Sequence, residues 1–312
     1  MLELIQQLTK RTFKHQATSG NMSTQSPFKL AGIMGWPVGH SRSPSIHNHW
    51  IKKHALNGVY VYLPVNPANA DDLKAALKGL SVMGFAGCNL TLPHKVMALS
   101  MVDRLDDTAK RMGAINTIVV EADGTLSGYN NDGYGYIQSL IDAKPDWCAD
   151  AGPVMVMGAG GAARAVVVSL AEKGAKDIRL CNRTDSHAQT LADAFSDDFA
   201  KNLGAKISVV TWANRHQALK GVALLVNTTS QGMGNNPALD LNLDALPKSA
   251  LVSDVVYIPM ETPLLKAAKA RGNATAGGLG MLLNQARPAF HKWFGVLPEV
   301  TPELVKIVEA TF

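Results

Sequence analysis

The sequence contains 312 residues, which at roughly 150 residues per domain predicts two domains. Hydrophobic residues make up 46% of the chain and charged residues 18%, a balance that excludes a disordered tail protein, a collagen-like chain and a coiled coil. The 30 Lys and Arg exceed the 25 Asp and Glu, giving a net charge of +5, and no block of like charges indicates a nucleic-acid arm or a membrane-binding patch.

Three cysteines, Cys88, Cys148 and Cys181, have neither metal-ligand nor CxxC spacing. The sequence therefore predicts no disulfide framework and no metal site, as is typical of a reducing compartment. The apolar runs at 165–168 and 222–226 fall far short of the ~20 residues of a membrane span, and the first 30 residues lack the apolar core of a signal peptide. We expect a cytoplasmic protein with no membrane partner.

Residues 1–27 differ from the rest of the chain, because regular patterning begins only at Phe28. Met22 offers a second start, so residues 1–21 are interpreted as a dispensable extension or a misplaced start, with an organelle-targeting peptide as the alternative. We expect this N-terminal extension to be poorly ordered.

Residues 29–143 alternate between apolar strands and helices. Strands are expected at 30–35, 59–65 and 85–90, and helices at 44–55, at 69–79 and after Pro93. A strand pair at 115–120 and 125–129 is joined by a turn at Asp123-Gly124, and a helix follows at 133–143. This alternation predicts an α/β domain.

A second series of elements begins after a turn at Gly152-Pro153. Strands are expected at 154–158, 178–182, 207–211, 223–228 and 251–257. Helices are expected at 161–173, 185–195, 214–219 and 262–271, followed by a helical stretch at 278–294 and a last helix after Pro302. Strands that alternate with helices of this length predict a parallel sheet.

A glycine-rich turn, residues 158–163, separates the first strand of this series from its first helix. Gly158 allows the tight turn, Gly160 lets the backbone approach a phosphate, and Ala163 lets helix and strand pack closely. The helix N-terminus adds unpaired N–H groups and a partial positive charge. This context favours a dinucleotide site over the alternative of an ordinary turn.

The next strand ends in Asn182-Arg183-Thr184, where an NAD-selective site would have a ribose-binding carboxylate. Arg183 favours NADP, because a planar guanidinium fits a 2′-phosphate. An exposed arginine without a ligand is the alternative, and Asp185 supplies a ribose acceptor that leaves NAD open as a secondary cofactor.

The first block carries several polar motifs. Ser41 and Ser43 stand just before a helix, where they can receive a carboxylate or, on the alternative interpretation, cap the helix. Lys95 follows a strand-to-helix turn and can act as a general acid or base, unless it is a solvated lysine, whose charge there would oppose the helix dipole. Polar residues at 113–117 and 128–133 are explained equally well by turn capping.

Nine motifs, taken in order, resemble the shikimate dehydrogenase family. They are HSRSP at 40–44, GCNLTLPHK at 87–95, GAINT at 113–117, YNNDG at 129–133, GAGGAARA at 158–165, NRT at 182–184, NTTSQGM at 227–233, DVVYIPMETPLL at 254–265 and GLGMLLNQA at 278–286. The resemblance implies a two-domain α/β fold. An α/β substrate domain spans 28–132 and is completed by 277–312, a Rossmann-like doubly wound parallel-sheet domain at 133–276 binds NADP, and the site lies in the cleft between them.

The resemblance also implies the activity, NADPH-dependent reduction of 3-dehydroshikimate to shikimate on the chorismate route to aromatic amino acids. Lys95 and Asp132 would form the catalytic acid–base pair. The substrate-binding residues would be Ser41, Ser43 and Tyr257 for the carboxylate, and Thr91, Asn116, Asp132 and Gln285 for the ring hydroxyls. The cofactor-binding residues would be Asp107, Gly158, Ala159, Gly160, Gly161, Ala162, Asn182, Arg183, Thr184, His187, Val255 and Gly278.

Three residues depart from the family's pattern: Asn131 replaces a usual Thr, Ser230 a usual Pro, and His187 a common second Arg. Because histidine titrates near neutrality, His187 predicts a weaker, pH-sensitive preference for NADP. One alternative function is a quinate/shikimate dehydrogenase that uses NAD or both cofactors. Another is a non-catalytic dinucleotide-binding regulatory module, against which stands the joint presence of Lys95, Asp132, Asn116 and Gln285. We expect a small-molecule substrate, no nucleic-acid partner, and a monomer or a homodimer.

Overall fold

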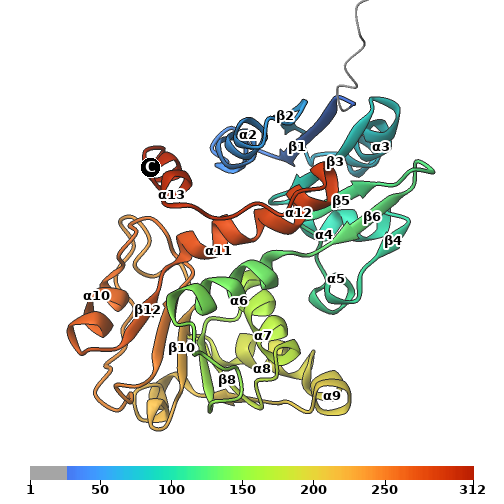
Figure 1. The fold of residues 1–312 in the computed structure, drawn as a ribbon. Helices are drawn as coiled ribbons and strands as arrows, with labels where there is room; N and C mark the ends of the chain where they lie inside the picture. The colour runs from blue at the N-terminus through green and yellow to red at the C-terminus, as the bar shows by residue number, and fades with distance from the viewer. Residues whose placement is uncertain (1–26) are drawn as a thin grey trace, which may run out of the picture.

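The computed structural model describes residues 27–312. The prediction of a poorly ordered extension concerns residues 1–27, and that of a dispensable or misplaced start concerns residues 1–21. Apart from Pro27, these residues lie outside the described part of the chain. The described chain forms two α/β units, each built on a six-stranded sheet, and Figure 1 shows them one above the other. No helix within residues 27–312 is long and apolar enough to cross a membrane.

The sheet of the first unit is mixed, with strand order β2-β1-β3-β5-β6-β4. Its strands are β1 (Lys29–Gly35), β2 (Gly58–Pro64), β3 (Phe85–Leu90), β4 (Arg104–Leu105), β5 (Thr117–Val120) and β6 (Leu126–Tyr129). β1 pairs in parallel with β2 and β3, whereas β5 is antiparallel to both β3 and β6. The helices here are α2 (Ser43–Lys53), α3 (Ala70–Val82), α4 (His94–Met97) and α5 (Asp107–Met112), with a 3-10 turn η1 (Ala98–Met101).

The sheet of the second unit is entirely parallel, with strand order β12-β11-β10-β7-β8-β9. Its strands are β7 (Val154–Met157), β8 (Asp177–Cys181), β9 (Lys206–Val210), β10 (Leu224–Asn227), β11 (Leu251–Asp254) and β12 (Ala274–Ala276). The strand order reverses at β7, which is the doubly wound order of dinucleotide-binding domains. The predicted fold class is confirmed. The helices are α6 (Asp132–Ala143), α7 (Gly161–Glu172), α8 (Asp185–Asp193), α9 (Ser196–Asp198) and α10 (Pro263–Ala270).

Both faces of the parallel sheet are buried, because successive side chains of its central strand enter different cores. Val154 and Val156 belong to one hydrophobic cluster, and Met155 and Met157 belong to another on the opposite face. All four side chains are at most 1% exposed. A strand buried on both sides reads as a continuous apolar run, as this one does.

The end of the chain returns to the first unit. α11 (Gly278–Asn284) packs along α6, and α12 (Ala286–Phe294) packs against β1, β3, β5 and α2. Trp293 is 1% exposed and donates its indole N–H to the Ile118 carbonyl at 2.9 Å. The last helix, α13 (Pro302–Glu309), packs on α2, and Figure 1 shows these red helices beside the blue and teal elements.

Two expected helices differ in the structure. The prediction of a helix at 214–219 is wrong. The segment forms two 3-10 turns, η3 (Trp212–Asn214) and η4 (Gln217–Leu219), and it ends at Gly221, which has φ +74°. The stretch expected at 278–294 divides at Gln285 into α11 and α12. Pro288 has no N–H to donate to the Asn284 carbonyl four residues earlier, which interrupts the helical hydrogen bonds there.

Candidate functional site

A cavity of about 300 Å³ lies between the two units. Its lining includes all eight residues predicted for catalysis and substrate binding: Ser41, Ser43, Thr91, Lys95, Asn116, Asp132, Tyr257 and Gln285. Three residues of the predicted cofactor set, Ala162, Val255 and Gly278, line it as well. The fold therefore brings residues from both units, separated by more than two hundred positions in the sequence, to one small space.

Lys95 and Asp132 form an ion pair in this cavity. Lys95 lies in the short helix α4, and Asp132 is the first residue of α6. The Lys95 Nζ and Asp132 Oδ2 atoms are 2.8 Å apart, and the side chains are 26% and 18% exposed. Asp132 is held in place by its own N–H, which donates to Asn130 Oδ1 at 3.0 Å. An ammonium held by a carboxylate at this distance can transfer a proton to the oxygen of a third group in the cavity.

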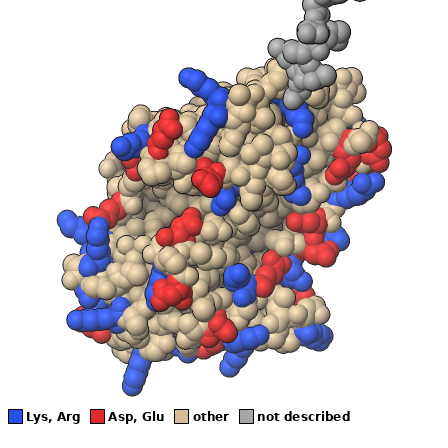
Figure 2. Space-filling view, in the orientation of Figure 1, with Lys and Arg blue, Asp and Glu red and all other residues tan. Residues whose placement is uncertain are grey.

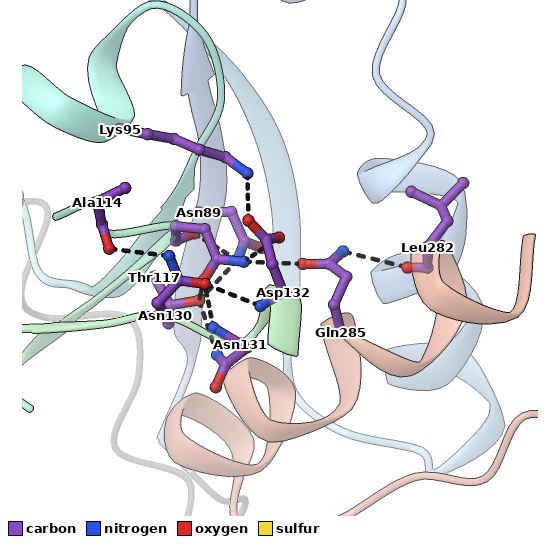
Figure 3. A network of polar contacts seen from close by, with 10 residues as sticks. Asn89, Lys95, Ala114, Thr117, Asn130, Asn131, Asp132, Leu282 and Gln285 are labelled. Carbon is purple, nitrogen blue, oxygen red and sulfur yellow. Dashed lines mark hydrogen bonds and ion pairs between the residues drawn. The ribbon is translucent and has the colours of Figure 1, made fainter. Parts of the chain in front are cut away.

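Asn116 connects this pair to Gln285, and Figure 3 shows Lys95, Asp132 and Gln285 in this network. Asn116 Nδ2 donates to Asp132 Oδ1 at 2.7 Å and to Gln285 Oε1 at 3.3 Å. Its Oδ1 accepts from Thr117 Oγ1 and from the Asn131 N–H, both at 2.9 Å. With two donors on its oxygen, the amide can present only its NH₂ group to the carboxylate. Asn116 is 2% exposed, so water does not compete for these bonds.

Sequence reasoning missed the role of four polar residues behind Asn116. Thr117 Oγ1 accepts from Asn89 Nδ2 at 3.1 Å and from Asn131 Nδ2 at 2.9 Å. Tyr60 donates its hydroxyl to Asn89 Oδ1 at 2.7 Å, which extends the network to β2. Asn89, Thr117 and Asn131 stand inside motifs that the sequence already showed, so their position was a signal, whereas Tyr60 lies in an ordinary apolar strand.

The two serines line the same cavity, at the start of α2. Their hydroxyl oxygens are 3.2 Å apart, and Ser41 Oγ accepts from the Ser43 N–H at 3.3 Å. Ser43 is the first helical residue rather than the cap, and the cap residue, Arg42, makes no side-chain capping bond. The expected capping role of Ser43 is therefore wrong, and both serines line the cavity beside the N-terminus of α2.

The glycine-rich turn between β7 and α7 fits a pyrophosphate. Gly158 has φ +116°, and a Cβ there would lie 2.5 Å from Thr228 Oγ1, so a side chain is excluded. Gly160 and Gly161 are exposed, and a Cβ at either would meet nothing within 4 Å. The N-terminus of α7 has no side-chain cap, so its first N–H groups remain open to an anion.

Arg183 lies beside this turn, after the neighbouring strand β8. Arg183, Thr184 and His187 are exposed, and no acidic residue within 27–312 pairs with Arg183. Asp185 Oδ1 accepts from the Trp212 N–H at 3.0 Å, so one oxygen of the alternative ribose acceptor is already occupied. A free guanidinium next to an engaged carboxylate fits a 2′-phosphate better than a ribose hydroxyl.

Asp254 fixes the segment that carries Val255 and Tyr257. It is 1% exposed and accepts from Thr262 Oγ1 at 2.7 Å, the Val256 N–H at 3.0 Å and Asn227 Nδ2 at 3.1 Å. Burial raises the pKa of this carboxyl, and the three donors oppose that rise. A Cβ on Gly278 would overlap the Val255 carbonyl, so glycine is required where α11 approaches this segment.

Asp107 lies apart from the cavity. Its side chain is 88% exposed and pairs with Lys110 at 2.9 Å on the surface of α5. Asn182, by contrast, follows β8 and donates to the Thr184 carbonyl at 2.9 Å, which holds the loop beside the glycine-rich turn. Asp107 thus does not line the cavity that Ala162, Val255 and Gly278 line.

Comparison with known proteins identifies the family. The family model of the shikimate dehydrogenase substrate binding domain matches residues 33–118, and that of shikimate / quinate 5-dehydrogenase matches residues 146–231. A shikimate dehydrogenase (NADP(+)) from Rhodospirillum rubrum is 50% identical over 276 residues, which cover 88% of this chain and 95% of that protein. The chain belongs to the shikimate dehydrogenase family. The resemblance seen in the motifs is confirmed.

Two solved structures show how the family's fold compares. Ligand-free 5-ketofructose reductase of a Gluconobacter species is 32% identical, with a TM-score of 0.83 over 92% of this chain and 100% of that one. The shikimate 5-dehydrogenase of Thermus thermophilus, in complex with NADP(H) and shikimate, is also 32% identical, with a TM-score of 0.75 over 91% and 100%. The same fold thus serves more than one substrate.

Proposed function

We propose that this enzyme reduces 3-dehydroshikimate to shikimate with NADPH and catalyses the reverse reaction. The observation that carries the proposal is the Lys95–Asp132 pair, 2.8 Å apart, in a cavity that also holds the paired hydroxyls of Ser41 and Ser43. This arrangement provides an acid–base pair and a carboxylate-binding group in one cavity. The substrate carries matching groups, a ring ketone and a carboxylate.

Lys95 supplies the proton in the direction of reduction. When bound, NADPH supplies the hydride, and negative charge then develops on the former ketone oxygen. The Lys95 ammonium stabilises this charge and transfers its proton to the oxygen. Asp132 orients Lys95 through Oδ2 and is itself fixed through Oδ1 by Asn116, so the ammonium stays aimed at one point of the cavity.

The remaining cavity residues bind the substrate. Asn116 and Gln285, whose side chains are 3.3 Å apart, are assigned to the ring hydroxyls together with Thr91. Ser41, Ser43 and Tyr257 are assigned to the carboxylate, with the N-terminus of α2 adding a partial positive charge. Binding at both ends holds the ketone beside Lys95.

We assign the two units to substrate and cofactor. Residues 28–132 together with 277–312 form the substrate domain, which the packing of α12 and α13 on the first unit supports. Residues 133–276 form the NADP domain, where residues 158–162 would hold the pyrophosphate and residues 182–187 the 2′-phosphate. Val255 and Gly278 line the cavity and would border the nicotinamide.

We place the enzyme in the cytoplasm, where thiols stay reduced, because Cys88, Cys148 and Cys181 are all free. On the face drawn in Figure 2, Lys and Arg side chains are interspersed with Asp and Glu over both units. The proposed function therefore rests on the small-molecule cavity and not on a charged surface.

A spectrophotometric assay tests this function. Shikimate and quinate are each offered with NADP and with NAD, and the absorbance of the reduced cofactor gives four rates. The shikimate–NADP rate is expected to be the highest, and Arg183→Gln should lower the preference for NADP over NAD. A higher rate with quinate would replace the proposed substrate, and equal efficiency of both cofactors would refute Arg183 as the selector.

Substitution of the general acid tests the mechanism. Lys95→Ala is expected to lower kcat about 100-fold or more while leaving NADPH binding nearly intact, because general acid catalysis contributes about that factor. The matched control is Lys78→Ala, an exposed lysine of α3. Wild-type turnover in Lys95→Ala would overturn the assignment.

A further inference from the structure

Arg42 stands between the two serines and lines the same cavity. Its guanidinium donates from Nη1 to the His40 carbonyl at 3.0 Å. No acidic side chain in the described part of the chain pairs with it, although ten ion pairs are formed there. The guanidinium therefore has a carbonyl contact but no counter-ion.

Among the charged residues of the described chain that line the cavity, Arg42 is the one without a partner of opposite charge. The lining residues include the charged residues Arg42, Lys95 and Asp132, together with His40. Lys95 and Asp132 neutralise each other at 2.8 Å. One guanidinium then remains unneutralised, and this excess matches a ligand with one negative charge.

The Phe312 ring lies against this guanidinium. The Arg42 Cζ atom lies 5.4 Å from the centroid of the Phe312 ring, within the range of a cation–π contact. The same ring lies 5.5 Å from the ring of Tyr257, which reaches the cavity from the second unit. Phe312 follows α13, whose buried Leu304 and Val308 belong to the core shared with α2.

The Phe312 ring thus stands between a cation of the first unit and a phenol of the second. A stacked guanidinium loses rotational freedom, so less entropy is lost when it forms a hydrogen bond to a ligand. The two serines flank Arg42 in the sequence and provide neutral donors, whereas only the guanidinium provides a full charge and a planar pair of N–H groups. Such a pair matches the two oxygens of a carboxylate.

We propose that Arg42, held in place by the Phe312 ring, is a specificity-determining residue that pairs with the substrate carboxylate. This rests on the proposed function and adds a charged partner to the hydroxyls assigned above. Phe312 is a positioning residue, since it touches Arg42 and Tyr257 rather than the cavity itself.

The decisive experiment compares a charged substrate with an uncharged one. Arg42→Gln is measured with shikimate and with shikimate whose carboxylate has been converted to the primary amide. With shikimate, KM should rise about 10- to 100-fold while kcat changes little, because a charge-assisted bond to the ground state is lost. With the amide, wild type and Arg42→Gln should have the same KM. Arg42→Lys keeps the charge but loses the planar pair, so its KM for shikimate should lie between the two.

Variants of Phe312 test the positioning role. Phe312→Ala should raise KM for shikimate about threefold, as expected for loss of a partly exposed cation–π contact, whereas Phe312→Tyr should restore it. Ile307→Ala, an exposed position of α13, is the matched control. KM for NADP should stay constant in every variant, and thermal unfolding identifies any variant that does not fold.

Three outcomes would decide against the assignment. An unchanged KM for shikimate in a folded Arg42→Gln, or an equal rise of KM with the amide, would overturn the pairing with the carboxylate. A wild-type KM in Phe312→Ala would overturn the positioning role. If wild type instead fails to oxidise shikimate but oxidises another carboxylic acid, the proposed function fails, and the Arg42 comparison is then made with that acid and its amide.

Discussion

Thr117 determines which way the amide of Asn116 faces. The hydroxyl of Thr117 donates its single proton to Asn116 Oδ1, while the NH₂ groups of Asn89 and Asn131 occupy its acceptor positions. All four side chains are less than 9% exposed. The network is therefore fully specified, and reversal of the Asn116 amide would bring its oxygen against the Asp132 carboxylate.

Thr117→Val removes the hydroxyl with little change of shape. Two buried N–H groups lose their acceptor and Asn116 loses a donor, so the free energy of unfolding should fall by about 1–3 kcal/mol. kcat/KM for shikimate should fall about 10-fold or more, and its pH profile should shift because Asn116 no longer steadies Asp132. Thr117→Ser keeps the hydroxyl and should restore both. Urea unfolding and pH-dependent kinetics measure the two effects, and a wild-type pH profile in Thr117→Val would contradict the positioning role.

At this scale the sequence predicted which residues meet but not what holds them. The eight residues predicted for catalysis and substrate binding all line the cavity, because each stands in a motif near an end of a strand or helix. Asn89 and Asn131 stand in the same motifs, yet their contacts depend on side-chain geometry that no spacing reveals. Arg42 lies inside the motif HSRSP at 40–44 as well, but its partner Phe312 is 270 positions away.

At the scale of elements, the close approach of α6 and α11 positions Gln285. A Cβ on Gly135 of α6 would lie 2.6 Å from the Cβ and N atoms of Gln285 and from the Met281 carbonyl. These distances are well inside van der Waals contact, so the helices can pack at this spacing only if the residue is glycine. Asp132 begins α6 and Gln285 directly follows α11, and both side chains accept from Asn116 Nδ2.

Gly135→Ala should force α6 and α11 apart. The free energy of unfolding should fall by about 1–3 kcal/mol despite the better helix propensity of alanine, and KM for shikimate should rise as Gln285 moves. The matched control is Gly79→Ala in α3, where the nearest atom to the added Cβ is the flexible end of Met83 at 3.4 Å. That variant should be as stable as wild type or up to about 1 kcal/mol more stable. Equal stability of the two variants in urea would refute the packing argument.

The prediction of helices and strands succeeded where the spacing of apolar residues agrees with the positions of turn-forming residues, as in the strands of the parallel sheet. It failed where local hydrogen bonds compete. Residues 212–219 have helical composition, but Arg215 donates to the carbonyls of Trp212 and Asp240, and the segment closes into 3-10 turns. The helix α5 was not predicted because six residues are too few for a periodic signal. β12 was not predicted either, since its three residues depend on pairing with β11.

For the whole molecule, Arg111 ties the two units together away from the cavity. It lies in α5 of the first unit and pairs with Glu172 of α7 at 2.5 Å and with Asp198 of α9 at 2.7 Å. The three side chains are between 22% and 34% exposed, so the contact is partly shielded from solvent. The helices α6 and α11, which pack against each other, also join the two units. Stability is therefore a property of both units together, and one buried group can affect the whole fold.

The response of the whole molecule to acid depends on a few groups whose pKa values are shifted by burial in opposite directions. Burial lowers the pKa of His47 and of His94, so protonation of either is resisted in the folded state. Burial raises the pKa of Asp106 and of Asp254, so these carboxyls bind protons more readily when folded. As the pH falls, the histidines destabilise the fold while the carboxyls offset part of that loss. The histidines act first, because their unfolded pKa of 6.5 lies above the 3.8 of the carboxyls.

His47 should dominate acid unfolding. It is fully buried in α2, with its ring stacked on Tyr60 at 4.1 Å, and burial lowers its pKa to about 3 from 6.5 in the unfolded chain. Its contribution to stability is complete above pH 6.5 and is lost as the pH falls toward 3, at roughly 1.4 kcal/mol per pH unit. Between about pH 7.5 and pH 5 the wild type should lose about 2 kcal/mol more than His47→Phe, in which nothing titrates at this position. Urea unfolding of both proteins at the two pH values measures the difference, with His54→Gln, an exposed position next to α2, as the control that should behave like wild type. Equal losses in wild type and His47→Phe would show that another group drives acid unfolding.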